Sequence, residues 1–461
     1  MTDLRNPTRR TFLKGATLAV PLAFGMQSAE PQDHPSETAP MWSYLGKSTR
    51  LSIAMWDFSW LISRYPGGPY DDLERRVAEA AERGYNALRV DCFPSRLLER
   101  ESTFPQRNWV PGVNLPQWGE NAAEHTCSVR TEVANLARLC RKYDIWLGLD
   151  SWDKAHMFRA AHPSFAEKSG APSDLIGGKA VTTISQDNEE GAFTAYGETW
   201  VKALKLMRDD GVLERAVWIA PMNEVPHFGG RSVESVIALG HNPKNEGETK
   251  LETAAELDAI YRRLNDYMGA PIRSEVSKER IPLSYSSLGA ENYAARLTDT
   301  YDVVDIHFMP EVILDDDDKR AFQKAGPGAP FGVFQDFEKC DLAAYSGAWD
   351  RACQKHYSAM LESVRKYFKT ALEHTTLASG KQLQAIVTEA YGPCFWPDSP
   401  KVDWEWYKRY NADALRVVAA MGLTGATLSN YGEPLFTLWN DVGWHWAGNS
   451  YFRTNAPTSR T

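Results

Sequence analysis

Cysteine is scarce in this 461-residue chain, and its spacing matches no metal-binding pattern. The cysteines stand at positions 92, 127, 140, 340, 353 and 394, and no two of them form a Cys-x-x-Cys pair. Zinc ribbons use that spacing, so the sequence argues against this kind of metal site. Free cysteine is among the most frequently buried residue types, and we expect most of these thiols to lie in apolar surroundings.

Basic clusters and glycine-rich nucleotide loops are also missing. The net charge is −9, and no stretch concentrates Lys and Arg as a nucleic-acid-binding surface would, so we expect no nucleic-acid partner. No Gly-x-Gly-x-x-Gly follows the first expected strand, which argues against a dinucleotide-binding domain, and we expect no cofactor. What the chain does have is 43% hydrophobic residues, enough for a large core.

The N-terminus is a segment of a different kind. TRRTFLKG (residues 8–15), followed by the apolar run ATLAVPLAFGM, resembles a twin-arginine export signal. That run is too short for a lasting transmembrane helix. We expect a signal peptide over residues 1–29, a Pro-, Glu- and Ser-rich linker over 30–48, and a mature protein in the periplasm or outside the cell without a membrane anchor. The alternative is a flexible basic N-terminus.

Export by this route follows folding in a reducing compartment, so the fold should not depend on disulfides. From residue 49 to 461, short β-rich runs alternate with segments of helical periodicity. Eight strands are expected, over residues 51–57, 86–92, 145–150, 216–224, 281–287, 301–309, 383–389 and 425–431. This alternation predicts an α/β fold, a (β/α)8 TIM barrel in a single catalytic domain. The periodicity shows no clear eighth helix after residue 432, and the DDDD run at 315–318 is expected to be a solvated loop.

Polar residues end several of these apolar strands. Active sites of such barrels lie at the C-terminal strand ends, so these side chains should surround one cavity. Two carboxyls there can divide the work if their pKa values differ, one attacking and one donating a proton. The strand-end residues are Asp57, Asp150, Glu224, His307 and Glu389.

The motifs at two strand ends resemble clan A glycoside hydrolases, in particular the family 5 cellulase-like branch. Asn223-Glu224 ends the fourth expected strand and Glu389 the seventh, and the resemblance covers roughly residues 50–440. It implies a retaining enzyme that cleaves O-glycosyl bonds of an oligo- or polysaccharide, with Glu224 as acid/base and Glu389 as nucleophile. It also implies that Asn223 binds the sugar 2-hydroxyl and that Arg89 supports the nucleophile.

Other positions depart from that family. Met309 stands where a tyrosine is usual, and the expected histidine of the third strand is absent. The remaining substrate-binding candidates are therefore taken from strand ends and nearby aromatics: Trp56, Asp57, Asp150, Trp152, His307, Tyr391 and Trp439. The candidates also have structural alternatives. Arg89 could form an ion pair at the end of the barrel, His307 could be a core histidine, and Trp56 could belong to the core.

Two other classes remain open. One is a metal-dependent barrel hydrolase, against which the first expected strand, IAMWDFSW, offers no histidine. The other is a non-catalytic carbohydrate-binding protein on a degenerate barrel, which would be expected to have lost one of the two glutamates. We expect a carbohydrate substrate and no metal. The sugar, the linkage, endo or exo action and the oligomeric state cannot be read from the sequence.

Overall fold

The computed structural model describes residues 50–106, 123–152, 157, 189–225, 227–228, 231–232, 254–277, 279–287, 289–308, 314–327, 329, 339–393 and 398–455. These residues belong to one unit of the chain, Thr38–Thr461. The expected signal peptide and linker lie outside them, and so do Met309 and Cys394. All the predicted site residues lie inside them.

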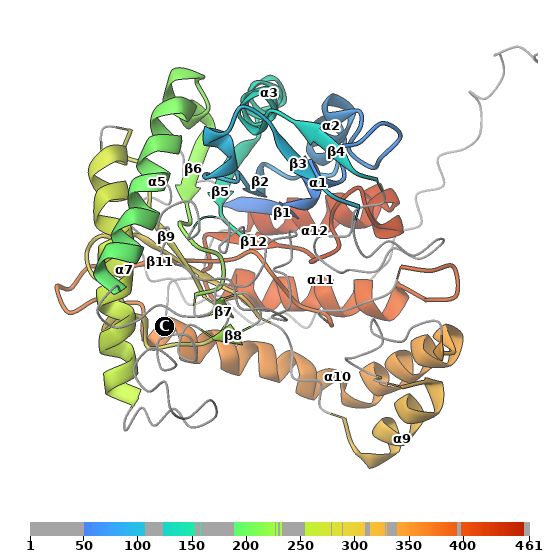
Figure 1. Ribbon diagram of the computed structural model, residues 1–461. Coiled ribbons are helices and arrows are strands. Elements are labelled where there is room, and N and C mark those ends of the chain that lie inside the picture. Colours follow the sequence, from blue (N-terminus) through green and yellow to red (C-terminus); the bar gives the residue numbers. More distant parts are fainter. Residues whose placement is uncertain are drawn as a thin grey trace, which may run out of the picture. The chain divides into compact units, whose positions relative to one another are not determined.

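Eight parallel strands form the central sheet (Figure 1), and they are the eight that the sequence predicts. They are β1 (Leu51–Asp57), β2 (Ala87–Asp91), β5 (Trp146–Asp150), β6 (Ala216–Ile219), β9 (Ser284–Ser287), β10 (Val303–Ile306), β11 (Gln384–Val387) and β12 (Gly425–Thr427). Their order is β6-β5-β2-β1-β12-β11-β10-β9. Parallel bridges from Ile219 to Leu283 and from Val225 to Ser287 join the two outer strands. The predicted (β/α)8 barrel is confirmed.

Helices alternate with the strands along the chain. The α-helices are α1 (Ser59–Ile62), α2 (Leu73–Glu82), α3 (Val129–Lys142), α5 (Glu189–Asp209), α7 (Ala254–Val276), α8 (Tyr293–Arg296), α9 (Asp316–Ala325), α10 (Leu342–Glu373), α11 (Glu405–Ala420) and α12 (Val442–Thr454). Short elements in the connections are η2 (Arg96–Leu98), β3 (Ser102–Phe104), β4 (His125–Cys127), η4 (Leu213–Arg215), β7 (His227–Phe228), β8 (Arg231–Ser232) and η7 (Thr437–Asn440). Among the described helices, none is both long and apolar enough to cross a bilayer.

Helix α12 is the helix that the periodicity after residue 432 does not show clearly. Asp441 caps it by accepting a hydrogen bond from the Trp444 N–H at 3.0 Å. Its buried residues, His445, Asn449 and Phe452, are spaced four and three apart as on one helix face. Two of the three are polar, so a search for apolar periodicity does not find this face. Their polar groups are nevertheless satisfied: for example, Asn449 Nδ2 donates to the Arg83 carbonyl at 2.8 Å.

The DDDD run is not a solvated loop. Asp315 is the N-cap of α9, and its side chain accepts from the backbone N–H groups of Asp317 and Asp318. The Asp318 side chain in turn accepts from the Asp315 N–H at 3.0 Å, which completes a capping box. Acidic residues are favourable here because the first turn of a helix carries partial positive charge. The five described cysteines are free.

The barrel interior is apolar at one end and polar at the other. Leu51, Ile53, Ala87, Val217, Trp218, Ala220, Val303 and Ile386 form one apolar cluster. The Trp218 ring fills this interior so closely that a Cβ on Gly148 would lie 1.9 Å from it, which explains the glycine in β5. Side chains alternate along a strand, so Arg89 shares the face of Ala87, and Asp305 that of Val303. Polar residues are thereby placed above an apolar floor, at the C-terminal end of the barrel.

Candidate active site

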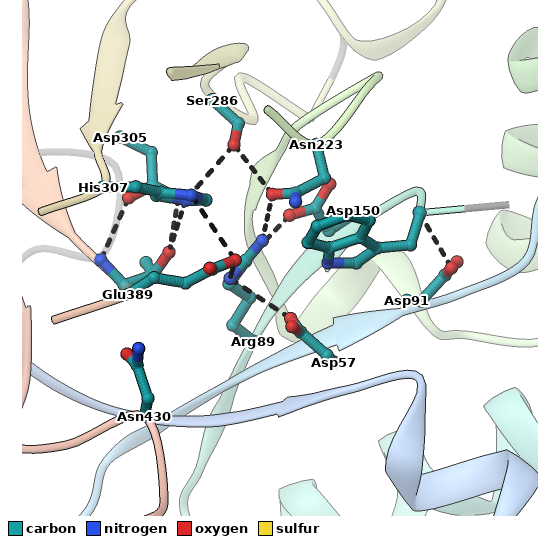
Figure 2. A network of polar contacts seen from close by, with 12 residues as sticks. Asp57, Arg89, Asp91, Asp150, Asn223, Ser286, Asp305, His307, Glu389 and Asn430 are labelled. Atoms are coloured by element: carbon teal, nitrogen blue, oxygen red, sulfur yellow. Dashed lines mark hydrogen bonds and ion pairs between the residues drawn. The ribbon is translucent and has the colours of Figure 1, made fainter. Parts of the chain in front are cut away.

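One buried arginine lies among the strand ends (Figure 2). Arg89, on β2, is fully buried, and its Nε donates to Asp150 Oδ2 at 2.8 Å and its Nη1 to Glu389 Oε1 at 2.6 Å. Nη1 also lies 3.2 Å from Asp57 Oδ1, and Nη2 donates to Asn223 Oδ1. These five residues, all predicted from the sequence, are therefore in direct contact. Charge-assisted bonds of this kind orient the carboxylates as well as bind them.

A buried histidine joins the two glutamates. His307 follows β10, and its Nδ1 lies 3.0 Å from Glu224 Oε1 and 3.4 Å from Glu389 Oε1. One carboxylate oxygen of Glu224 and one of Glu389 lie within 4.8 Å of each other. Glu389 is fully buried, and Glu224 is 7% exposed. The structure thus brings the predicted pair of glutamates to one place, with an imidazole between them.

The backbone turns sharply where Glu224 leaves the barrel wall. Strand β6 ends at Ile219, earlier than predicted, and Glu224 has a φ of 46°, in the left-handed region. That region costs a residue with a Cβ about 1–2 kcal/mol. Two bonds to β9 hold the turn: the Glu224 N–H donates to Ser286 Oγ and the Val225 N–H to the Ser286 carbonyl, both at 3.0 Å. Strain of this kind is frequent at functional sites.

Burial and the two cations act in opposite directions on the acids of the site. Burial raises the pKa of Asp57, Asp150 and Glu389, while Arg89 acts to lower all three. Burial also works to lower the pKa of His307, but neighbouring carboxylates outweigh it and raise that pKa to about 10. Arg89 and His307 thus face the same group of carboxyl side chains.

Trp152 is held beside this site by another carboxylate. Asp91, at the end of β2 (Figure 2), accepts from the Phe93 N–H at 2.6 Å and from the Trp152 N–H at 2.8 Å. The Trp152 ring meets Phe58 edge to face, with ring centroids 6.0 Å apart. The Asp91 carboxylate thus holds the segment after β2 and the segment after β5, where Trp152 lies two residues beyond Asp150.

Three predicted aromatic residues lie elsewhere. Trp56 faces the helix layer, because side chains alternate along β1, and it packs edge to face against Trp439 at 6.4 Å. The Trp439 Nε1 donates to Glu79 Oε2 of α2 at 2.9 Å. Tyr391 is fully buried, and its N–H donates to Asn411 Oδ1 of α11 at 3.1 Å. Within the described residues, these contacts are with the helix layer rather than with the two glutamates.

Sequence reasoning missed three polar residues of the barrel interior. Ser286, Asp305 and Thr388 each place an oxygen 3.3–3.4 Å from His307 Nε2. Asp305 precedes His307 by two positions and so shares its face of β10, a parity that could have identified it. Ser286 and Thr388 give no such signal, because buried hydroxyls are common in barrel strands that have no site.

A further buried acid lies in the loop after β12. Glu433 Oε2 accepts from the Tyr70 hydroxyl at 2.6 Å, and Oε1 from Ser59 Oγ at 3.4 Å. Burial raises the pKa of Glu433 well above its usual range, although the hydrogen bonds from Tyr70 and Ser59 act to lower it. Glu433 ties the segments after β1 to the loop after β12.

Two groups of side chains have a spacing that would suit a metal ion. In each, the ligand atoms lie within 4.8 Å of one another: Glu224 with His307 and Glu389, and Asp315 with Asp318 and His356. In the first group the Arg89 guanidinium already supplies a positive charge, 2.6 Å from Glu389 Oε1. In the second group the two aspartates form the cap of α9. Both arrangements are thus explained by interactions within the chain.

A (β/α)8 barrel with paired glutamates at the ends of its fourth and seventh strands defines the class of cellulase-like glycoside hydrolases. The profile of one family, described as sugar-binding cellulase-like, matches residues 53–162 and 191–453. The chain belongs to this family, which confirms the prediction of a cellulase-like glycoside hydrolase. No curated protein matches the chain.

Solved structures are similar to the chain at low sequence identity. A candidate glycoside hydrolase from Parabacteroides distasonis has a TM-score of 0.59 and 19% identity, covering 89% of this chain and 96% of that one. A family 5 broad-specificity endoglucanase from Clostridium acetobutylicum has a TM-score of 0.45 and 11% identity, with coverage of 91% and 100%. A xyloglucan-specific β-1,4-glucanase from a ruminal metagenomic library has a TM-score of 0.43 and 13% identity, with coverage of 84% and 89%.

Proposed function

We propose that this protein hydrolyses a glycosidic bond of an oligo- or polysaccharide with net retention of anomeric configuration. The observation that carries the proposal is the distance of at most 4.8 Å between carboxylate oxygens of Glu224 and Glu389. Retaining enzymes hold their two carboxyl groups about 5–5.5 Å apart, whereas inverting enzymes hold them further apart to admit a water. The short distance favours direct attack by one carboxylate on the sugar.

Glu389 takes the role of nucleophile. Its Oε1 is held by Arg89 at 2.6 Å, while Oε2 has no hydrogen-bond partner among the described residues. Oε2 is therefore the oxygen that attacks the anomeric carbon, as Glu224 protonates the departing oxygen. Glu224 then takes a proton from water, which displaces Glu389 from the glycosyl-enzyme. Two inversions restore the original configuration.

Asn223 takes the role of substrate ligand. Its Oδ1 accepts from Arg89 Nη2 and from Ser286 Oγ, so the orientation of the amide is determined. Its Nδ2 is buried and has no partner in the described part of the chain. A buried donor without a partner is costly, and the hydroxyl at the sugar 2-position would satisfy it.

The rival function, carbohydrate binding without catalysis, is tested by the same experiments. A 2-deoxy-2-fluoro glycoside with a dinitrophenolate leaving group should label the peptide AIVTEAYGP, residues 385–393, on Glu389. Proton NMR early in hydrolysis should show a first product of retained configuration. An inverted product would refute the nucleophile role, and the absence of both turnover and label would favour a binding protein.

The acid/base role of Glu224 has its own test. Glu224→Ala should lose far more activity on substrates with poor leaving groups than on activated aryl glycosides, and azide should restore turnover as a glycosyl azide. Glu291→Gln is the matched control, since Glu291 is a partly buried carboxyl that accepts from the Tyr285 hydroxyl at 2.8 Å and is ion-paired with Arg296. Equal loss on both substrates without rescue would count against Glu224.

We also propose export. The support is the run TRRTFLKG at residues 8–15, which meets the twin-arginine pattern. The product would then act in the periplasm or outside the cell, where polysaccharides are available as substrates.

A further inference from the structure

The imidazole between the two glutamates has a second layer of contacts behind it. On the side away from the glutamates, His307 Nε2 lies 3.3 Å from Ser286 Oγ, 3.3 Å from Thr388 Oγ1 and 3.4 Å from Asp305 Oδ2. Figure 2 shows Ser286 and Asp305 beside the His307 ring. These residues come from β9, the end of β11 and β10, and all are fully buried. Whether Nε2 is protonated therefore depends on whether these three oxygens direct hydrogens or lone pairs toward it.

The hydroxyl hydrogen of Ser286 is already in use. Its Oγ lies 2.8 Å from Asn223 Oδ1, which has no hydrogen of its own and also accepts from Arg89, so Ser286 must donate there. The same Oγ accepts from the Glu224 N–H at 3.0 Å. Only a lone pair of Ser286 remains to face His307.

The hydroxyl of Thr388 is used in the same way. Its Oγ1 donates to Asp305 Oδ2 at 2.6 Å, and the Thr388 N–H donates to Asp305 Oδ1 at 3.0 Å. All three oxygens around His307 Nε2 thus present lone pairs. An unprotonated Nε2 would direct its own lone pair at these oxygen lone pairs, which is repulsive. We therefore infer that Nε2 carries a proton.

On its other side, the oxygens that His307 Nδ1 faces within the described residues belong to carboxylates. Nδ1 lies 3.0 Å from Glu224 Oε1 and 3.4 Å from Glu389 Oε1, and the latter oxygen already accepts from Arg89. A general acid must keep its proton on the oxygen that faces the leaving group. If that oxygen of Glu224 is Oε2, then Oε1 presents only lone pairs and Nδ1 must also carry a proton.

We propose that His307 is a permanent imidazolium whose two N–H groups both bond to the protein, and that Ser286, Thr388 and Asp305 are positioning residues that keep it so. The imidazolium donates from Nδ1 to Glu224 Oε1, so the catalytic proton of Glu224 is carried by Oε2. It also supplies Glu389 with a second cation after Arg89. The proposal rests on the acid/base role of Glu224, but the charge of His307 can be measured without turnover.

The charged groups around the ring support this assignment. The raised pKa of His307, about 10, has the same direction, with Glu389 and Asp305 as its main favourable causes. Other groups face the ring or its backbone from the neighbouring elements. The acids are Glu224 after β6 and Asp57 on β1. Arg89 on β2 acts on the ring through its bond to Glu389. The Tyr367 hydroxyl of α10 donates to the His307 carbonyl at 2.7 Å.

Nitrogen-15 NMR of ring-labelled histidine tests the charge directly. The chain has ten histidines, and His307→Gln identifies the resonances of His307. We expect both ring nitrogens to be protonated at neutral pH in the free enzyme. A ring with protonated Nε2 and bare Nδ1 would overturn the imidazolium, since Glu224 would then donate to it through Oε1.

Variants behind the ring test the positioning residues. Asp305→Asn should lower the titration of His307 by about 1–3 pH units, and Ser286→Ala or Thr388→Val by about 0.5–1 unit each. Ser284→Ala is the matched control, because Ser284 is buried on the same strand and its hydroxyl has no partner among the described residues. An unmoved titration in Asp305→Asn, or an equal shift in the control, would overturn their role.

The effect on the glutamates gives a readout that a purely structural role would not move. Without the cation of His307, Glu224 and Glu389 should hold their protons more tightly. Both limbs of the kcat/KM–pH profile of His307→Gln should therefore move to higher pH, by about one unit. Limbs that stay in place would overturn the electrostatic role. If instead azide fails to rescue Glu224→Ala while both ring nitrogens of His307 are protonated, the acid/base role of Glu224 is wrong and the charge assignment stands.

Discussion

Removing Arg89 should make the stability of the barrel strongly dependent on pH. In Arg89→Met a side chain of similar length loses its charge, and Asp57, Asp150 and Glu389 lose a partner at 3.2, 2.8 and 2.6 Å. All four side chains are at most 1% exposed, so water cannot replace the guanidinium. Breaking a buried ion pair costs about 3–5 kcal/mol at neutral pH.

The sign of the pH dependence follows from the protons bound. Burial raises the pKa of these acids, and without Arg89 their folded-state values rise further above those of the unfolded chain. The folded state then binds more protons than the unfolded state, so stability is greatest at acid pH and falls as pH rises through the folded-state values. The deficit of Arg89→Met should therefore be smaller at about pH 5 than at about pH 8.

Thermal unfolding followed by circular dichroism measures this deficit. With about 2.1 cal/mol/K of unfolding entropy per residue, 3–5 kcal/mol corresponds to a Tm lower by about 3–6 °C near neutral pH. The control is Arg141→Met, which removes an exposed pair with Glu214 and should cost less than about 1 kcal/mol. A deficit that is equal at both pH values, or no larger than that of the control, would refute the counter-charge role of Arg89.

Two further predictions concern export and metal. Replacement of Arg9 and Arg10 by Lys should leave the protein uncleaved in the cytoplasm, since a receptor reads the arginine pair, and normal export in a fractionation experiment would contradict the signal. Dialysis against a chelator should leave activity unchanged, because Arg89 already supplies a positive charge beside Glu389 Oε1. Loss of activity that added zinc restores would favour the metal-dependent class instead.

The eight strands could be predicted because each is a short apolar run between periodic helices, and local pattern is enough for that. Asn223, Glu224 and Glu389 could be found because they stand at the ends of apolar runs, and Arg89 because it interrupts one. Helix α12 was missed because His445 and Asn449 occupy its buried face. Its hydrogen bonds come from segments far away in the sequence, and no local pattern records them.

The aromatic candidates show a different limit. Trp56 and Asp57 are adjacent, so an alternating strand cannot point both into the barrel, and this parity alone separates them. Tyr391 follows its strand in an irregular segment and Trp439 lies in the short helix η7, so the alternation of a strand predicts the direction of neither side chain. Asp315 was misread because four acids in a row look solvated, whereas a cap needs only the first and the last of them.

The bond between Arg89 and Glu389 joins positions 300 residues apart. During synthesis, the ribosome releases Arg89 long before its nucleophilic partner exists. Strand β1 meanwhile lacks one neighbour, since it pairs with both β2 and the last strand, β12. Until the C-terminal quarter of the chain emerges, one edge of β1 is unpaired in the nascent protein. Arg89 then has Asp57 and Asp150 as partners but not yet Glu389. A chaperone that shields this edge would therefore be needed for longest just before the catalytic centre is complete, and a ribosome stalled after β10 should yield a species that is both inactive and prone to aggregation.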